Sequence, residues 1–133
     1  MSAVEGLKRW HAVLENGSKA EELATIVHED AVFHSPVVHT PQRGRALVVG
    51  YLAAAGKTLG NDSFTYVREL IDGTDALLEF TTEMDGIHVN GIDLIRFDED
   101  GMIVDFKVMI RPLKAVNKVW EQMAAMLEAM KAS

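Results

Sequence analysis

One acidic residue stands out as a group that could do chemistry. Asp93 lies in residues 87–97, where apolar and polar side chains alternate as in a β-strand. Its neighbours on the same strand face are all apolar or glycine, namely Ile87, Val89, Gly91, Ile95 and Phe97. A carboxyl group on an apolar face is costly unless it is paired, hydrogen-bonded or protonated. Such groups are rare in cores and common in sites, so Asp93 is predicted to meet a ligand in a pocket.

Two further side chains are candidate catalytic groups that could act together with Asp93. Tyr51 falls on a predicted helix, from which its hydroxyl could lie near Asp93. His39 follows Pro36 in a loop and could supply a base, since histidine titrates near about 6.5. Asp93, Tyr51 and His39 are therefore the predicted catalytic residues. Each has a plainer alternative: a bonded core carboxyl, a core tyrosine and a surface histidine.

A set of mostly apolar side chains is expected to surround the ligand. An apolar wall with few polar groups suits a small hydrophobic molecule, although the same residues would also fill a solid core. The histidines show no tight pair on one helix and no His-Glu-x-x-His motif, so neither a metal nor a cofactor is predicted. The predicted ligand-binding residues are Trp10, Phe33, Ser35, Phe80, Thr82, Phe106 and Val108.

Composition limits the class of protein. The 133 residues fit one domain, 1–133, and apolar and charged residues make up 48% and 25% of the chain, as in globular proteins. A net charge of −7 argues against nucleic acid and anionic membranes as partners. The absence of cysteine fits a reducing compartment, and the first residues lack a signal-peptide pattern. A cytoplasmic location is expected.

Helical signals dominate the first half of the chain. Val4, Leu7, Trp10 or His11, and Leu14 recur at helical spacing up to Asn16-Gly17. Ser18 and Glu21 have the spacing of a capping box for a second helix. A short strand is expected over 30–35, a loop over 36–44 and a third helix over 45–59.

Strand signals dominate the second half. Strands are predicted over 63–71, 75–85, 87–97 and 102–110, with turn residues between them, so they should form an antiparallel meander. Helices followed by strands indicate an α+β fold, with helices on one sheet face. That inner face should carry Tyr66, Phe80, Asp93, Val104 and Phe106, and the outer face should be mostly charged.

A last helix is predicted over 113–131. Its apolar residues draw a narrow stripe that should pack on its own domain or on a dimer partner. The alternative is a flexible, methionine-rich lid over a ligand cavity. The stripe consists of Leu113, Val116, Trp120, Met123, Leu127 and Met130.

Two local strings resemble a known superfamily. Residues 29–36, Glu-Asp-Ala-Val-Phe-His-Ser-Pro, are followed by Arg43-Gly44 and a helix, and residues 91–97, Gly-Ile-Asp-Leu-Ile-Arg-Phe, precede Asp100-Gly101 and a final strand. Both strings are similar to those of the SnoaL-like and ketosteroid isomerase superfamily, which has the nuclear transport factor 2-like fold. The resemblance spans residues 4–111 and implies a cone, in which a strongly curved sheet wraps around helices and an internal pocket. The final helix is not part of the isomerase pattern.

The resemblance carries over to the catalytic residues only in part. Ketosteroid isomerases have a base aspartate immediately before the proline of the first strand, and Ser35 stands there. Their oxyanion-binding tyrosine in the first helix corresponds to Trp10, and their second, protonated aspartate corresponds to Asp93. The resemblance thus implies a pocket and, by analogy, a homodimer through the outer sheet face.

The expected function is correspondingly broad. The chain is expected to act on a small apolar ligand by acid/base chemistry, as an isomerase, cyclase, dehydratase or hydrolase. Because serine is a poor base near neutral pH, the isomerase mechanism of the superfamily is disfavoured. The alternative is a non-catalytic module of the same fold that binds a ligand or a protein.

Overall fold

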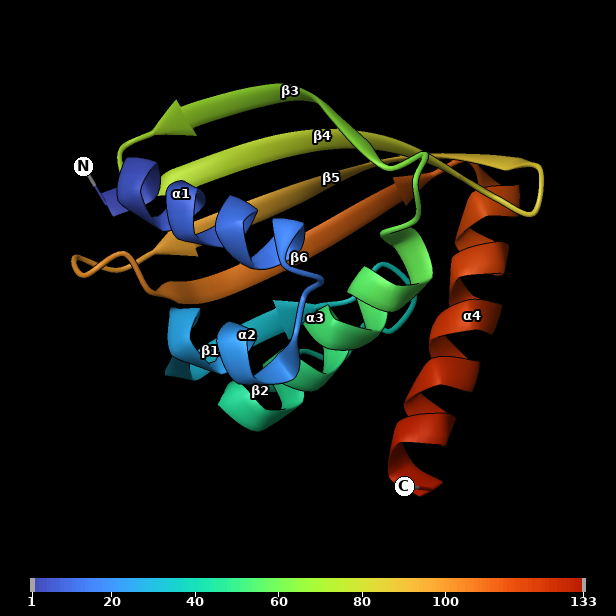
Figure 1. The fold of residues 1–133 in the computed structure, drawn as a ribbon, viewed down its shortest axis with the longest axis horizontal. Coiled ribbons are helices and arrows are strands. Elements are labelled where there is room, and N and C mark those ends of the chain that lie inside the picture. The colour runs from blue at the N-terminus through green and yellow to red at the C-terminus, as the bar shows by residue number, and fades with distance from the viewer. Residues whose placement is uncertain (1, 133) are drawn as a thin grey trace.

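A curved six-stranded sheet forms one layer of the molecule, and three helices lie under its inner face (Figure 1). The computed structural model describes residues 2–132, without the side chains of residues 2, 127 and 130–132. The elements in chain order are α1 (Ser2–Glu15), α2 (Ala20–Ile26), β1 (Val27–His34), β2 (Gln42–Arg43), α3 (Arg45–Leu59), β3 (Thr65–Asp72), β4 (Asp75–Met84), β5 (Ile87–Phe97), β6 (Ile103–Arg111) and α4 (Leu113–Ala132).

The meander predicted for the second half is confirmed. The strands follow the order β2-β1-β6-β5-β4-β3, and each consecutive pair from β3 to β6 is antiparallel. Asp85 and Gly86 both have positive φ in the turn that joins β4 to β5, as a tight hairpin requires. The sequence did not reveal that β1 adds parallel to β6, which extends the sheet beyond the meander.

A register change between β5 and β6 alters the inner face from the predicted alternation. Val104 was expected on this face, but a shift after Arg96 pairs Phe97 with Ile103 instead. Ile103 is therefore fully buried, whereas Val104 is only half-buried. Such a bulge moves one residue out of alternation, which a period-two pattern cannot register.

The helices lie close to the predicted ranges, with two differences at the start of the chain. In α1 the buried stripe begins at Ala3, and Val4 is exposed. The predicted capping box is wrong: Lys19 is the N-cap of α2 and makes no side-chain cap. Ser18 instead has φ +53 and is buried against α3, where Gly56 leaves room for it.

The face that α4 turns to the domain differs from the predicted stripe. Leu113 and Trp120 are 74% and 55% exposed, whereas Ala115, Val119 and Met123 are buried. The buried residues recur every four positions because α4 packs along α3 and the ends of β5 and β6. Leu127 and Met130 of the predicted stripe lie outside the described side chains.

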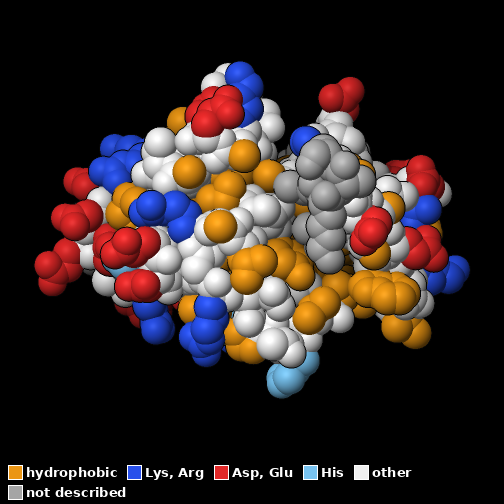
Figure 2. All heavy atoms as spheres, turned by 90° about the horizontal axis from the view of Figure 1, so that it is seen from below, with side chains coloured by type: hydrophobic (Ala, Val, Ile, Leu, Met, Phe, Trp, Pro, Cys, Tyr) orange, Lys and Arg blue, Asp and Glu red, His pale blue; other side chains and the backbone are white. Residues whose placement is uncertain are grey.

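The surface seen from below in Figure 2 has apolar side chains gathered toward the middle and charged ones nearer the edges. Within residues 2–132, no helix combines the length and the apolarity that crossing a bilayer would take.

Candidate functional site

The helices and the sheet enclose a cavity of about 420 Å³, a size typical of small-molecule sites. Its exposed wall residues include Glu15, Gly17, Gly60 and Asn61, so it opens between the ends of α1 and α3. Val119 and Met123 of α4 complete the wall, so part of the final helix belongs to the site. The deeper wall is apolar and is formed by residues such as Phe33, Leu52, Phe80, Phe106 and Val108.

Asp93 lies in this apolar wall at the end of a chain of three side chains. Its Oδ2 accepts a hydrogen bond of 2.7 Å from the hydroxyl of Tyr66. That hydroxyl in turn accepts one of 3.1 Å from the indole Nε1–H of Trp10. Trp10 donates to Tyr66 and Tyr66 donates to Asp93, so the single proton of the tyrosine hydroxyl is already used and cannot be donated to a ligand. Tyr66 and Trp10, which also line the cavity, therefore hold the carboxyl group in place.

The second oxygen of Asp93 is available to a ligand. No described residue donates a hydrogen bond to Oδ1, and Asp93 lines the cavity. Every fully buried side-chain nitrogen or oxygen among the described residues has a partner, so Oδ1 is in contact with the cavity. The residue as a whole is only 6% exposed. One carboxyl oxygen is thus fixed by protein and the other faces an apolar space.

Burial controls the protonation of this carboxyl group. Removal from water raises the pKa of Asp93 to about 7, against the opposing effect of the Tyr66 hydrogen bond. Burial, together with the neighbouring Asp93, also raises the pKa of Tyr66 above its ordinary value, so the phenol stays neutral. Near neutral pH Asp93 can therefore be a proton donor or, once ionised, an acceptor.

Six predicted site residues line the cavity and two catalytic candidates do not. Tyr51 stacks behind Phe33 with ring centroids 5.1 Å apart, so its ring supports the wall from outside. His39 is exposed in the loop between β1 and β2 and is absent from the wall. The six in the wall are Asp93, Trp10, Phe33, Phe80, Phe106 and Val108.

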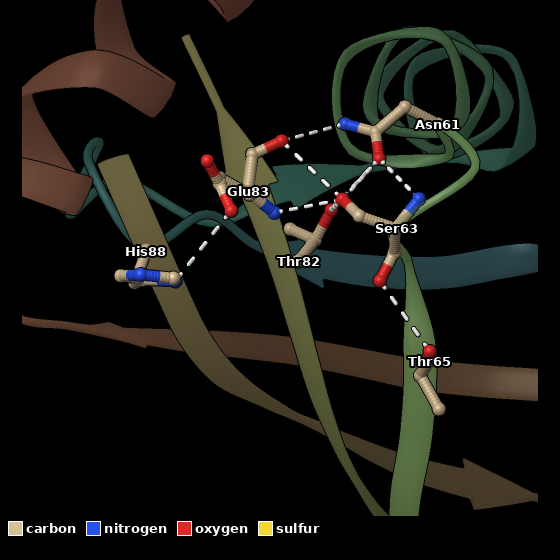
Figure 3. A network of polar contacts seen from close by, with 6 residues as sticks. All are labelled: Asn61, Ser63, Thr65, Thr82, Glu83 and His88. Carbon is tan, nitrogen blue, oxygen red and sulfur yellow. Dashed lines mark hydrogen bonds and ion pairs between the residues drawn. The ribbon is translucent and has the colours of Figure 1, made fainter. Parts of the chain in front are cut away.

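Ser35 and Thr82 also lie outside the main cavity. The hydroxyl of Ser35 accepts a hydrogen bond from the backbone N–H of Val37, which shapes the turn after β1. Thr82 is buried in a polar network that ties the end of α3 to β4 (Figure 3). In this network Ser63 bonds both Thr82 and the backbone of Glu83, and Asn61 donates to the same backbone. Thr82 thus supports the cavity opening at Asn61 without facing the cavity.

Several wall residues were not assigned to the site from the sequence. Tyr66 was placed on the inner face but given no role, and its pairing opposite Phe80 depends on a bulge between Tyr66 and Arg68. His11 was left as an alternative to Trp10 on one helix, and both line the cavity. The signal for His11 was its position next to a predicted wall residue. Val119 was not part of the apolar stripe predicted for α4, and the sequence contains no signal that places it in the wall.

Among the described residues, no group of three or more histidine, aspartate or glutamate side chains could hold a metal ion.

Comparison with known proteins agrees with this architecture. The family model of the SnoaL-like domain matches residues 7–106. A steroid delta-isomerase from Pseudomonas aeruginosa has a similar structure, with 36% identity over 99% of this chain and 96% of its own, and a TM-score of 0.91. No curated protein shows a significant similarity to the sequence.

More distant structures share the fold. A protein with a cystatin-like fold from Silicibacter pomeroyi DSS-3 is 29% identical over 90% of this chain and 83% of its own, with a TM-score of 0.82. A nuclear transport factor 2-like protein from Mesorhizobium loti is 20% identical over 84% and 92%, with a TM-score of 0.70. The matched segment contains α3, the hairpin of β4 and β5, and Asp93 in its pocket. The chain therefore belongs to the SnoaL-like family.

Proposed function

We propose that the protein binds a small, largely apolar carbonyl compound in its cavity and transfers protons on it, as an isomerase does. The observation that carries the proposal is Asp93, a carboxyl group with one oxygen held by Tyr66 and the other facing an apolar cavity. The similarity to a protein described as a steroid delta-isomerase supports the same class of substrate. The reaction would be acid/base chemistry without a cofactor.

The proposed role of Asp93 follows from its protonation. The neutral acid donates a hydrogen bond to the carbonyl oxygen of the ligand. When a proton leaves the carbon next to the carbonyl, negative charge develops on that oxygen and the hydrogen bond strengthens. Because the wall around Asp93 is apolar, this stabilisation is worth more than it would be in water. Trp10 and Tyr66 would keep the acid aimed at the oxygen while the charge develops.

The binding part of the proposal can be tested with 2-acetonaphthone, an apolar aryl ketone that only accepts hydrogen bonds. Its affinity should be constant at low pH and fall by up to about tenfold per pH unit above about 7, because ionised Asp93 cannot donate. In an Asp93→Asn variant the amide still donates and carries no titrating proton, so the affinity should be independent of pH. Asp100→Asn, in the exposed turn before β6, should keep the wild-type pH dependence.

The result that would overturn this proposal is equally direct. An Asp93→Asn variant whose ketone affinity falls with pH just as in the wild type would exclude Asp93 as the donor. Failure of the wild type to bind any aryl ketone would exclude the substrate class.

A second function is favoured by one observation. Ser35 occupies the place where ketosteroid isomerases have their base, and its hydroxyl is engaged in the turn after β1. The alternative is therefore a domain that binds the carbonyl compound without catalysis. Proton exchange at the methyl group of 2-acetonaphthone in D₂O, followed by NMR, distinguishes the two. An enzyme accelerates this exchange in a pocket-dependent manner, whereas a binding module leaves it at the rate in buffer.

A further inference from the structure

The cavity wall contains one histidine among the described residues, His11, and its ring contacts the tyrosine that donates to Asp93. The titratable wall residues are His11, Glu15, Tyr66 and Asp93. Tyr66 and Asp93 are bonded to each other, and Glu15 is an exposed residue at the opening. Of these four, His11 is the imidazole, which has a nitrogen lone pair that can accept a proton, and its ring has no hydrogen bond to give up among the described residues.

The position of His11 is fixed by its neighbours on two elements. It follows Trp10 on α1, and its ring meets Tyr66 edge-on, with centroids 5.5 Å apart and planes at 78°. His11 therefore contacts the ring of the same tyrosine whose hydroxyl donates to Asp93. The His11 ring is about one-third exposed and forms part of the cavity wall.

One carboxylate, that of Glu69, lies beside the His11 ring, and a second follows on the same helix. Glu69 of β3 lies with Oε1 3.7 Å from Nε2, which is an ion-pair distance and longer than a hydrogen bond. Glu15 lies one helical turn further along α1, on the same side of the helix as His11. Glu69, at ion-pair distance, would stabilise the imidazolium that forms when His11 takes up a proton. In catalytic triads a carboxylate likewise orients the histidine and stabilises its imidazolium.

We propose that His11 is the base of this site and that Glu69 positions it. The inference rests on the function proposed above. An imidazole nitrogen takes the proton from the carbon next to the carbonyl group, the C–H pair forms a C=C bond, and the carbonyl π pair moves onto oxygen. Asp93 donates a hydrogen bond to that oxygen throughout. The imidazolium then returns the proton to another carbon of the conjugated system and the carbonyl group re-forms.

A bromomethyl ketone tests this arrangement directly. In 2-(bromoacetyl)naphthalene the carbon next to the carbonyl carries bromide, so a nitrogen placed there forms an N–C bond while bromide leaves with the C–Br pair. The chain has no cysteine to compete for the reagent. His11 should be alkylated at least about tenfold faster than His28, His34, His39 and His88, as judged by peptide mass mapping. Excess 2-acetonaphthone should protect His11 and leave the slow background unchanged.

A pair of variants provides the second readout. His11→Gln should slow deuterium exchange into 2-acetonaphthone by about 100-fold or more at unchanged ketone affinity, which also shows that the variant is folded. Glu69→Gln should slow the exchange less and also leave affinity unchanged, whereas Glu69→Asp should recover part of the rate. The matched control is Glu99→Gln, in the exposed turn between β5 and β6, which should stay within about threefold of the wild type.

The outcomes separate this inference from the proposed function. If the protein binds ketone but His11→Gln exchanges deuterium at the wild-type rate, His11 is not the base. The same conclusion follows if the bromomethyl ketone labels the other histidines as fast as His11. Either result leaves the proposed binding function intact. Absence of ketone binding in the wild type would overturn both.

Discussion

Replacing Asp93 by asparagine is expected to stabilise the folded protein by an amount that depends on pH. Burial raises the pKa of Asp93 from an ordinary value of 3.8 to about 7. Between these two values the folded protein holds a proton that the unfolded chain has released, so wild-type stability falls as the pH rises. Asparagine has nearly the same shape and no proton to lose. The variant should therefore lack this fall.

The size of the effect follows from the same shift. Each pKa unit corresponds to about 1.4 kcal/mol, so the ionised carboxylate costs the folded state about 4 kcal/mol well above neutral pH. The free energy of unfolding of Asp93→Asn minus that of the wild type should grow by about 3 kcal/mol from about pH 5 to about pH 8. It should then level off, because Asp93 is ionised in both states.

Urea unfolding followed by tryptophan fluorescence, at one protein concentration, measures this difference. The altered hydrogen bond to Tyr66 adds a constant offset, so the dependence on pH is the quantity that matters. Asp100→Asn, on an exposed turn, should follow the wild type. A difference that stays flat within about 0.5 kcal/mol between about pH 5 and pH 8 would refute the reasoning that burial controls Asp93.

Three further predictions follow from other contacts. Tyr66→Phe deprives Trp10 of its acceptor and Asp93 of its donor, so it should cost about 1–3 kcal/mol in urea unfolding and move the pH midpoint of ketone binding upward. Gly91→Ala would place a methyl group 2.5 Å from Phe80 Cζ and 2.8 Å from the Met109 carbonyl oxygen. This overpacking should lower the free energy of unfolding by about 1–3 kcal/mol. Gly50→Ala, in open space on α3, should be neutral or stabilising. Met109 is 52% exposed on the outer sheet face near the exposed Leu94. If two copies pair through this face, Met109→Asp should halve the molecular mass measured by sedimentation, whereas Leu47→Asp on α3 should leave it unchanged. A wild-type protein that sediments as a monomer would contradict this pairing.

The sequence predicted those parts of the fold that depend on local signals. Strand β5 and helix α3 have the predicted bounds, since both lie between strong turn or stop residues such as Gly86 and Gly60. Alternation along β5 also placed Asp93 on the buried face correctly. These features require only the periods of strands and helices and the chemistry of turns.

The sequence did not predict features that depend on contacts between distant segments. The partner of Asp93 is Tyr66 and not Tyr51. Alternation placed Tyr66 on the inner face, but its pairing opposite Phe80 depends on the bulge in β3, which alternation does not register. Similarly, α4 buries Val119 and exposes Trp120, since the shape of α3 and the sheet decides which side of the helix packs. A bulge and a helix rotation leave no period in the sequence from which either could be read.

The balance of forces at Asp93 is itself an argument for function. A carboxyl group in a wholly apolar cavity would stay neutral at every physiological pH, and one paired with a cation would stay ionised. Here burial raises the pKa while the hydrogen bond from Tyr66 lowers it, and the outcome of about 7 leaves both forms accessible. Packing alone would be served as well by an asparagine, which avoids the cost of burying a charge. A titrating acid with one oxygen turned to the cavity gains only where a ligand exchanges hydrogen bonds or protons with it.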